Sequence, residues 1–223
     1  MASEDVWIED WLSAERFAPY LTKSGGRRSR ALALYEWNAQ LGAAFLHDLN
    51  HLEIALRNAY DRQLVHATVP GDVHWTNKNT ALVLFPPHMR QGARGRKLID
   101  VNNTPREKIA TARRAAKSPV AGKVVAELMF GFWTYMTSDI HEKTLWVPYL
   151  HNAFPSNTDR GKVHGTLSEV REFRNRVAHH EPILSRPEVH RRQIVFLMRL
   201  VCPAAVGHLN THSEVSGVLA RRP

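Results

Sequence analysis

Residues 29–65 read SRALALYEWNAQLGAAFLHDLNHLEIALRNAYDRQLV, and this stretch decides the fold. It follows the helix-breaking pair Gly25-Gly26. Almost all of its large apolar residues recur at steps of three or four residues or their sum, as along one face of an α-helix; they are Leu34, Leu41, Phe45, Leu49, Leu52, Leu56, Tyr60 and Leu64. The spacing predicts one long amphipathic helix from about Ser29 to Val65.

Helix start signals recur in the middle of the chain. Thr104–Glu107 has the pattern of a capping box with proline at the first helical position, and Ser118-Pro119 repeats the entry for a helix that runs to about Met136. Near the end of this stretch, Phe130, Trp133 and Met136 have the spacing of one buried helix face. A further helix is expected at 141–153, with a kink at Pro148.

The C-terminal third of the chain also carries helix start and stop signals. Thr166–Glu169 forms a second capping box, and Pro182 is expected to stop the helix that it opens. Arg186-Pro187 marks another helix entry, and the tail from Pro203 has room for two short helices. No strand pattern competes, so the predicted fold class is an all-α helical bundle.

The domain organisation follows from where the helical pattern stops. Residues 70–103 carry several turn-forming pairs and are expected to form a mostly irregular, basic insert. Residues 203–223 form a C-terminal tail, and no linker long enough to separate domains interrupts residues 1–223. We therefore expect a single domain.

Composition indicates a protein that does not cross a membrane. The single Cys202 excludes an internal disulfide framework and fits a reducing compartment. The acidic start of the chain lacks the basic region of a signal peptide. The most apolar stretch, residues 124–133, is too short to span a bilayer. We expect a cytoplasmic protein with no cofactor.

The net charge of +9 favours a polyanionic partner, most simply RNA. The excess is concentrated between Pro86 and Lys123, and the RNA-binding candidates there are Arg94, Arg96, Lys97, Arg113 and Arg114. The other interpretation of this region is a solvated helix face beside a basic loop.

The chemistry is densest at residues 174–183, which read RNRVAHHEPI. Arg174 offers a permanent cation, Asn175 an amide and His179 a titratable imidazole, which are the groups that a metal-independent ribonuclease needs. His180 and Glu181 are secondary candidates, since the helix dipole and the carboxylate both favour imidazolium here. The alternative is that these side chains cap the helix or form solvated ion pairs.

Helix geometry constrains how these groups can act. Asn175 and His179 are four residues apart and share a face, whereas Arg174 and His179 are about 140° apart around a helix of 3.6 residues per turn. Arg174 and His179 therefore meet at one phosphate only if the last turn is distorted or if a second copy of the chain faces the first.

A second polar set lies in the long helix and comprises Glu53, Arg57 and Asn58. Glu53 and Arg57 have the spacing of a structural ion pair. They could instead line a cleft together with the helix that carries Arg174. A metal site at His47 and His51 is disfavoured, because no Glu follows the first His as it does in His-Glu-x-x-His. We therefore expect no metal.

Six segments together resemble one family. Arg174–His179 is similar to the Arg-polar-x-x-x-His motif of the HEPN superfamily. The segments that resemble its Abi-like (abortive infection) branch are His179–Ile183, Gly131–Trp133, Ala153–Pro155, Leu52–Ala59 and, in texture, Tyr35–Asn38. They occur in the family's order and span most of the chain.

This resemblance implies a HEPN-like helical bundle, usually a homodimer, and in many members a metal-independent endoribonuclease of phage defence or a toxin–antitoxin system. Arg174 would then hold the scissile phosphate, His179 would be the general acid or base for attack by the ribose 2′-hydroxyl, and Asn175 would orient the imidazole or the RNA. An antitoxin or a defence-complex protein is a further implied partner. The alternatives are a non-catalytic HEPN module that binds RNA or nucleotide, and a purely structural helical domain.

Overall fold

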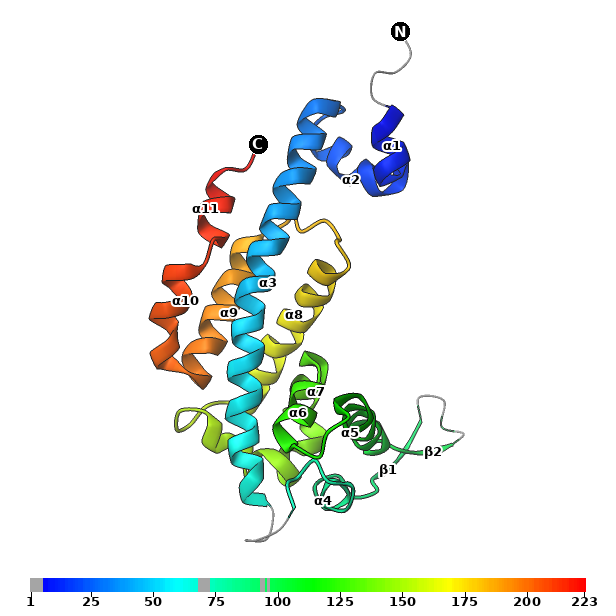
Figure 1. The fold of residues 1–223 in the computed structure, drawn as a ribbon, viewed down its shortest axis with the longest axis vertical. Helices are drawn as coiled ribbons and strands as arrows, with labels where there is room; N and C mark the ends of the chain where they lie inside the picture. Colours follow the sequence, from blue (N-terminus) through cyan, green and yellow to red (C-terminus); the bar gives the residue numbers. More distant parts are fainter. Residues whose placement is uncertain (1–5, 68–72, 93–94, 96) are drawn as a thin grey trace.

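One helix organises the molecule. The computed structural model describes residues 6–67, 73–92, 95 and 97–223, and in it α3 (Arg28–Leu64) spans 37 residues. It runs along the whole height of the molecule, and the other helices lie around it (Figure 1). The prediction of a helix from Ser29 to Val65 is confirmed to within one residue at each end.

The other elements are shorter. The helices before α8 are α1 (Val6–Leu12), α2 (Ala14–Lys23), α4 (Lys78–Leu84), α5 (Asn103–Ala116), α6 (Ala121–Ala126) and α7 (Phe130–Tyr135). The later ones are α8 (Arg160–Ala178), α9 (Pro187–Val201), α10 (Val206–His212) and α11 (Val215–Ala220). Single turns of 3₁₀ or π-helix occur at Val65–Ala67, Asp139–His141, Glu142–Trp146, Leu150–Ala153 and Pro203–Ala205. The mostly helical content confirms the all-α class.

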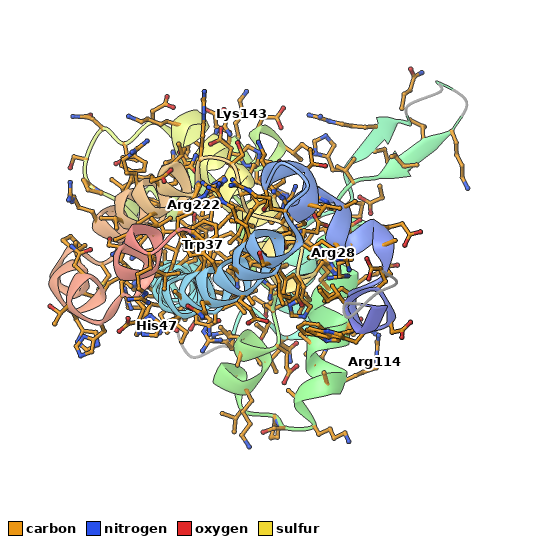
Figure 2. The ribbon with its side chains drawn as sticks, turned by 90° about the horizontal axis from the view of Figure 1, so that it is seen from above. Arg28, Trp37, His47, Arg114, Lys143 and Arg222 are labelled. Atoms are coloured by element: carbon orange, nitrogen blue, oxygen red, sulfur yellow. The ribbon has the colours of Figure 1, made fainter. Side chains whose placement is uncertain are left out.

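α3 packs against α2, α9 and α11. The Trp37 indole donates a hydrogen bond to the Val218 carbonyl at 2.7 Å, which ties α11 to α3. The Arg222 guanidinium lies 4.9 Å from the centre of the Trp37 ring and covers its face (Figure 2). The predicted C-terminal tail is therefore part of the packed bundle.

An aromatic core surrounds the C-terminal end of α3. Tyr60, Trp75, Phe132 and Trp133 are all fully buried, and their rings meet edge to face or stacked at centroid distances of 5.1 to 6.4 Å. Such pairs add about 1 kcal/mol each beyond the burial of their area. The prediction that the aromatic stripe of residues 130–136 is core is confirmed.

Two predicted capping boxes do not start helices. α8 begins at Arg160, because the Asp159 carboxylate accepts a hydrogen bond from the Lys162 N–H and caps it. Thr166 lies inside α8, and its hydroxyl donates to the Lys162 carbonyl. α5 likewise begins at Asn103, so that Thr104 is its second residue. The Thr-x-x-Glu pattern therefore does not by itself mark where a helix begins, because it also occurs inside a helix.

Two long predicted helices are interrupted. The stretch entered at Ser118-Pro119 divides into α6 and α7, and at the break the buried Trp133 indole donates to the Leu128 carbonyl at 3.1 Å. The expected helix at 141–153 is a π-helical turn and a 3₁₀ turn instead, with Pro148 between them. In both places local packing replaces a regular helix.

The predicted irregular insert contains more structure than expected. It holds α4 and an antiparallel hairpin of β1 (Met89–Gln91) and β2 (Leu98–Asp100), in which Arg90 pairs with Ile99. The hairpin stands away from the helical body in both views (Figures 1 and 2). Within the described residues, no helix combines the length and the apolar character needed to cross a membrane.

Candidate active site and cleft

The helix that carries the candidate motif stays regular to its end. The His179 N–H donates to the Asn175 carbonyl at 2.9 Å, as in any α-helical turn. The chain leaves the helix at His180, which has a φ of +56°. The N–H groups of His180 and Glu181 donate to the carbonyls of Val177 and Arg176, which is a Schellman motif. The distorted last turn that would bring Arg174 to His179 is therefore not formed.

Neighbouring helices fix this end of α8. The Arg16 guanidinium donates to the His180 carbonyl at 3.2 Å, and Arg176 donates to the Pro182 carbonyl while its Nε lies 3.6 Å from Glu181. The buried Asn38 side chain accepts a hydrogen bond from the Ile183 N–H at 2.8 Å. The contacts of Arg16 with His180 and of Asn38 with Ile183 thus hold the helix end against α2 and α3, and the Arg176–Glu181 contact lies within the helix end itself.

An open cleft of about 570 Å³ lies between α5, α7 and α8. Arg174 and Asn175 line it from α8, together with Arg171 one turn earlier. Among the described residues Arg174 has no direct hydrogen-bond or ion-pair partner, although it interacts electrostatically with the Glu53 carboxyl group. Its N–H donors are therefore not used by another side chain and can bind an anion. Two of the three predicted catalytic residues therefore face the same cavity.

Glu53 lies behind this wall of the cleft. Burial raises the pKa of its carboxyl group, against the opposing effects of the Arg174 and Arg57 guanidinium groups and of the Phe130 N–H at the start of α7. Glu53, on α3, is therefore close enough to the start of α7 and to Arg174 of α8 for both to affect its pKa. It forms no close ion pair with Arg57 or with any other described residue.

His179 lies outside the cleft. It is an exposed residue at the C-terminal end of α8, one turn beyond Asn175 on the same face. Its position is about 140° around the helix from Arg174. Asn58 is also exposed and does not line the cleft. Within one chain, Arg174 and Asn175 line the same cleft, whereas His179 does not line it.

The predicted RNA-binding residues do not surround the cleft. Arg113 and Arg114 line a different cavity, and Lys97 is exposed in the hairpin. The Arg114 guanidinium donates a hydrogen bond at 2.9 Å to the hydroxyl of Thr111, which does line the cleft. Arg94 and Arg96 lie outside the described residues.

Sequence reasoning missed two cations that do line the cleft, Lys108 from α5 and Arg171 from α8. Arg171 could have been found, because it is three residues before Arg174 on the same helix face. Lys108 belongs to the basic region between Pro86 and Lys123 but was not among the residues chosen from it.

The histidines of α3 have structural neighbours. The rings of His47 and His51 are 4.7 Å apart, and the His51 ring is 5.9 Å from that of His208 in α10. Between them the fully buried Asp48 accepts a hydrogen bond from Ser213 at 2.8 Å and lies 3.3 Å from Arg191. Among the described residues no three His, Cys, Asp or Glu side chains are grouped so that they could hold a metal ion.

Comparison with known proteins adds no relative from which a function could be transferred. No protein-family model, curated protein or solved structure matches the chain. The motif and the cleft are therefore the features of this chain that bear on its function.

Proposed function

We propose that this chain is a metal-independent endoribonuclease of a prokaryotic phage-defence or toxin–antitoxin system, of the Abi-like type within the HEPN superfamily. The observation that carries the proposal is the placement of Arg174 without an ion-pair partner, beside Asn175, on the wall of an open cleft. An unpaired, partly buried guanidinium is a strong phosphate ligand because its planar N–H donors match phosphate oxygens.

The proposed reaction is attack by a ribose 2′-hydroxyl on the adjacent phosphorus. The P–O5′ bond breaks, and the products are a 2′,3′-cyclic phosphate and a 5′-hydroxyl. Arg174 holds the phosphate and stabilises the charge that develops on it. His179 removes the proton from the 2′-oxygen or donates one to the departing 5′-oxygen. Asn175 orients the RNA or the imidazole, and the half-buried Glu53 carboxyl group acts on Arg174 only through its charge.

The proposed active form is a homodimer. Because α8 is regular up to His179, Arg174 and His179 diverge within one chain. A second copy related by two-fold symmetry can bring its His179 to the first copy's Arg174. RNA is the substrate, and an antitoxin or a defence-complex protein is the proposed regulator.

Purified protein incubated with RNA in EDTA tests the proposal. The wild type should cut RNA and leave cyclic phosphate ends, and RNA with 2′-deoxyribose at the cut should resist. His179→Ala should slow cleavage about 100-fold or more. His66→Ala and Arg62→Ala, which remove other exposed residues near the far end of α3, serve as controls. Cleavage that persists in His179→Ala would reject the assignment.

The second candidate function is RNA or nucleotide binding without cleavage. It is favoured by the position of His179, which lies outside the cleft that Arg174 and Asn175 line. In that case Arg174→Ala should weaken RNA binding about as strongly as it would if the protein were an enzyme. No cleavage products should form with the wild type or with any variant.

A further inference from the structure

The cleft beside Arg174 has an apolar floor. Leu128, Phe130 and Phe132 are nearly completely buried and present their edges to it, and Ala112 from α5 completes the floor. Met129 stands at the rim with two thirds of its surface exposed. Exposed methionine is unusual on a protein surface and adapts its flexible thioether to flat ligands.

The walls of the same cleft carry three cations, Lys108, Arg171 and Arg174. None of the three has an ion-pair partner among the described residues, although Glu107 and Glu127 also line the cleft. The cations of the lining outnumber its carboxylates by three to two. A purely apolar ligand would make no use of the cations, and a free phosphate would make no use of the apolar floor. A nucleotide satisfies both parts, because its base is flat and largely apolar on its faces and its phosphate is anionic.

We propose that this cleft holds one unpaired nucleobase of the bound RNA, next to the phosphate that Arg174 contacts. The proposal rests on the proposed function only in taking RNA as the ligand. A base within a duplex offers its edge but not its faces, so a ring enters a cavity of this kind only when it is unstacked and unpaired. Single-stranded RNA or an RNA loop is therefore the substrate class, and duplex RNA is excluded from the cleft.

Ala115 provides a way to fill the cleft without disturbing the core. It is exposed on α5 and faces the cavity. Ala115→Trp should occupy the space of the base, whereas Ala220→Trp at the exposed end of α11 is the matched control. Met129→Ala is a second variant, which removes the exposed thioether at the rim of the cleft. Its control is Val147→Ala, which truncates another exposed apolar residue. Circular dichroism melting checks that each variant folds.

Binding is measured by fluorescence anisotropy in the His179→Ala background, so that RNA stays intact. The probes are a single-stranded RNA, the duplex of the same sequence, and the single strand with abasic nucleotides. Ala115→Trp should weaken single-strand binding about tenfold and bring it to the level of the abasic RNA, because stacking of one base contributes on this scale. Duplex binding should not change, and Met129→Ala should weaken binding less.

The outcomes separate this inference from the proposed function. Equal binding of single-strand and abasic RNA, or unchanged binding in a folded Ala115→Trp variant, would overturn the base site even if the wild type cleaves RNA. Base-dependent binding that Ala115→Trp removes would support the site even if no variant cleaves RNA in EDTA.

Discussion

His141 is a buried imidazole that makes the stability of the fold depend on pH. Its ring packs between Phe85 and Tyr135 at centroid distances of 5.5 and 4.9 Å, and its Nε2 has no hydrogen-bond partner among the described residues. Burial lowers the pKa of His141 from 6.5 to about 4, with a smaller contribution in the same direction from His88. The folded protein therefore keeps this ring neutral at a pH where the unfolded chain protonates it.

We predict that the free energy of unfolding falls as the pH falls from about 6.5 to about 4. In this range the unfolded state binds more protons than the folded state, and the loss for this residue is on the order of 3 kcal/mol. His141→Phe keeps an aromatic ring in place and should make the free energy of unfolding depend less on pH. Urea unfolding at several pH values measures this free energy.

Part of the slope should remain in His141→Phe, since burial also lowers the pKa of His51 and His190. A variant whose stability still declines as steeply as that of the wild type would show that His141 is not the group responsible.

At the scale of elements, α5 lines two cavities, each with a different face. Lys108 and Ala115 line the cleft, whereas Arg113 and Arg114 line the second cavity. The second face can contribute to RNA binding only through its charge, along the backbone of a strand that extends past the cleft. Its effect should therefore depend on salt and not on base identity.

We predict that Arg113→Ala combined with Arg114→Ala weakens RNA binding at low salt but leaves the rate of cleavage at saturating RNA unchanged. The slope of log affinity against log salt should fall by about 0.7 for each cation that contacts a phosphate of single-stranded RNA. Titrations at several salt concentrations measure this slope. The matched control is Arg192→Ala with Arg199→Ala, two exposed residues of α9. Equal losses in both pairs would indicate a general effect of net charge instead of a binding face.

The elements show where sequence reasoning succeeds. The apolar stripe of α3 is long enough that its 3.6-residue period fixes both ends, and Arg186-Pro187 marks the start of α9 correctly. The predicted start of α8 at Thr166 was wrong, since the helix begins at Arg160. Gly161 and Gly165 weaken the helical signal in its first turns. The hairpin was missed because both strands are largely exposed and show no alternation of apolar and polar residues.

The candidate site was predictable only in part. Spacing alone places Asn175 and His179 on one face of a helix and separates Arg174 from His179. The cleft could not be predicted, since its lining residues in α5 and α7 lie 39 or more positions before those in α8. The same long-range packing brings the carboxyl group of Glu53 within electrostatic range of Arg174.

For the whole molecule, the regular end of α8 decides how a complete site can form. Arg16, Asn38 and Arg176 hold the helix end at three points. A rearrangement that brought His179 to Arg174 within one chain would break these contacts. Assembly of two copies leaves them intact, and a two-fold axis would give two equal sites, each with Arg174 from one protomer and His179 from its partner.

We predict that two inactive variants complement each other. Arg174→Ala and His179→Ala should each be inactive alone. When they are mixed and allowed to exchange protomers, half of the dimers contain one of each, and one of the two sites in such a dimer has both wild-type residues. Cleavage should therefore return to about a quarter of the wild-type rate. An Arg174→Ala, His179→Ala double variant mixed with either single variant is the control and should stay inactive. If the mixture of single variants stays inactive although mass spectrometry shows the mixed dimer, both residues must act from the same chain.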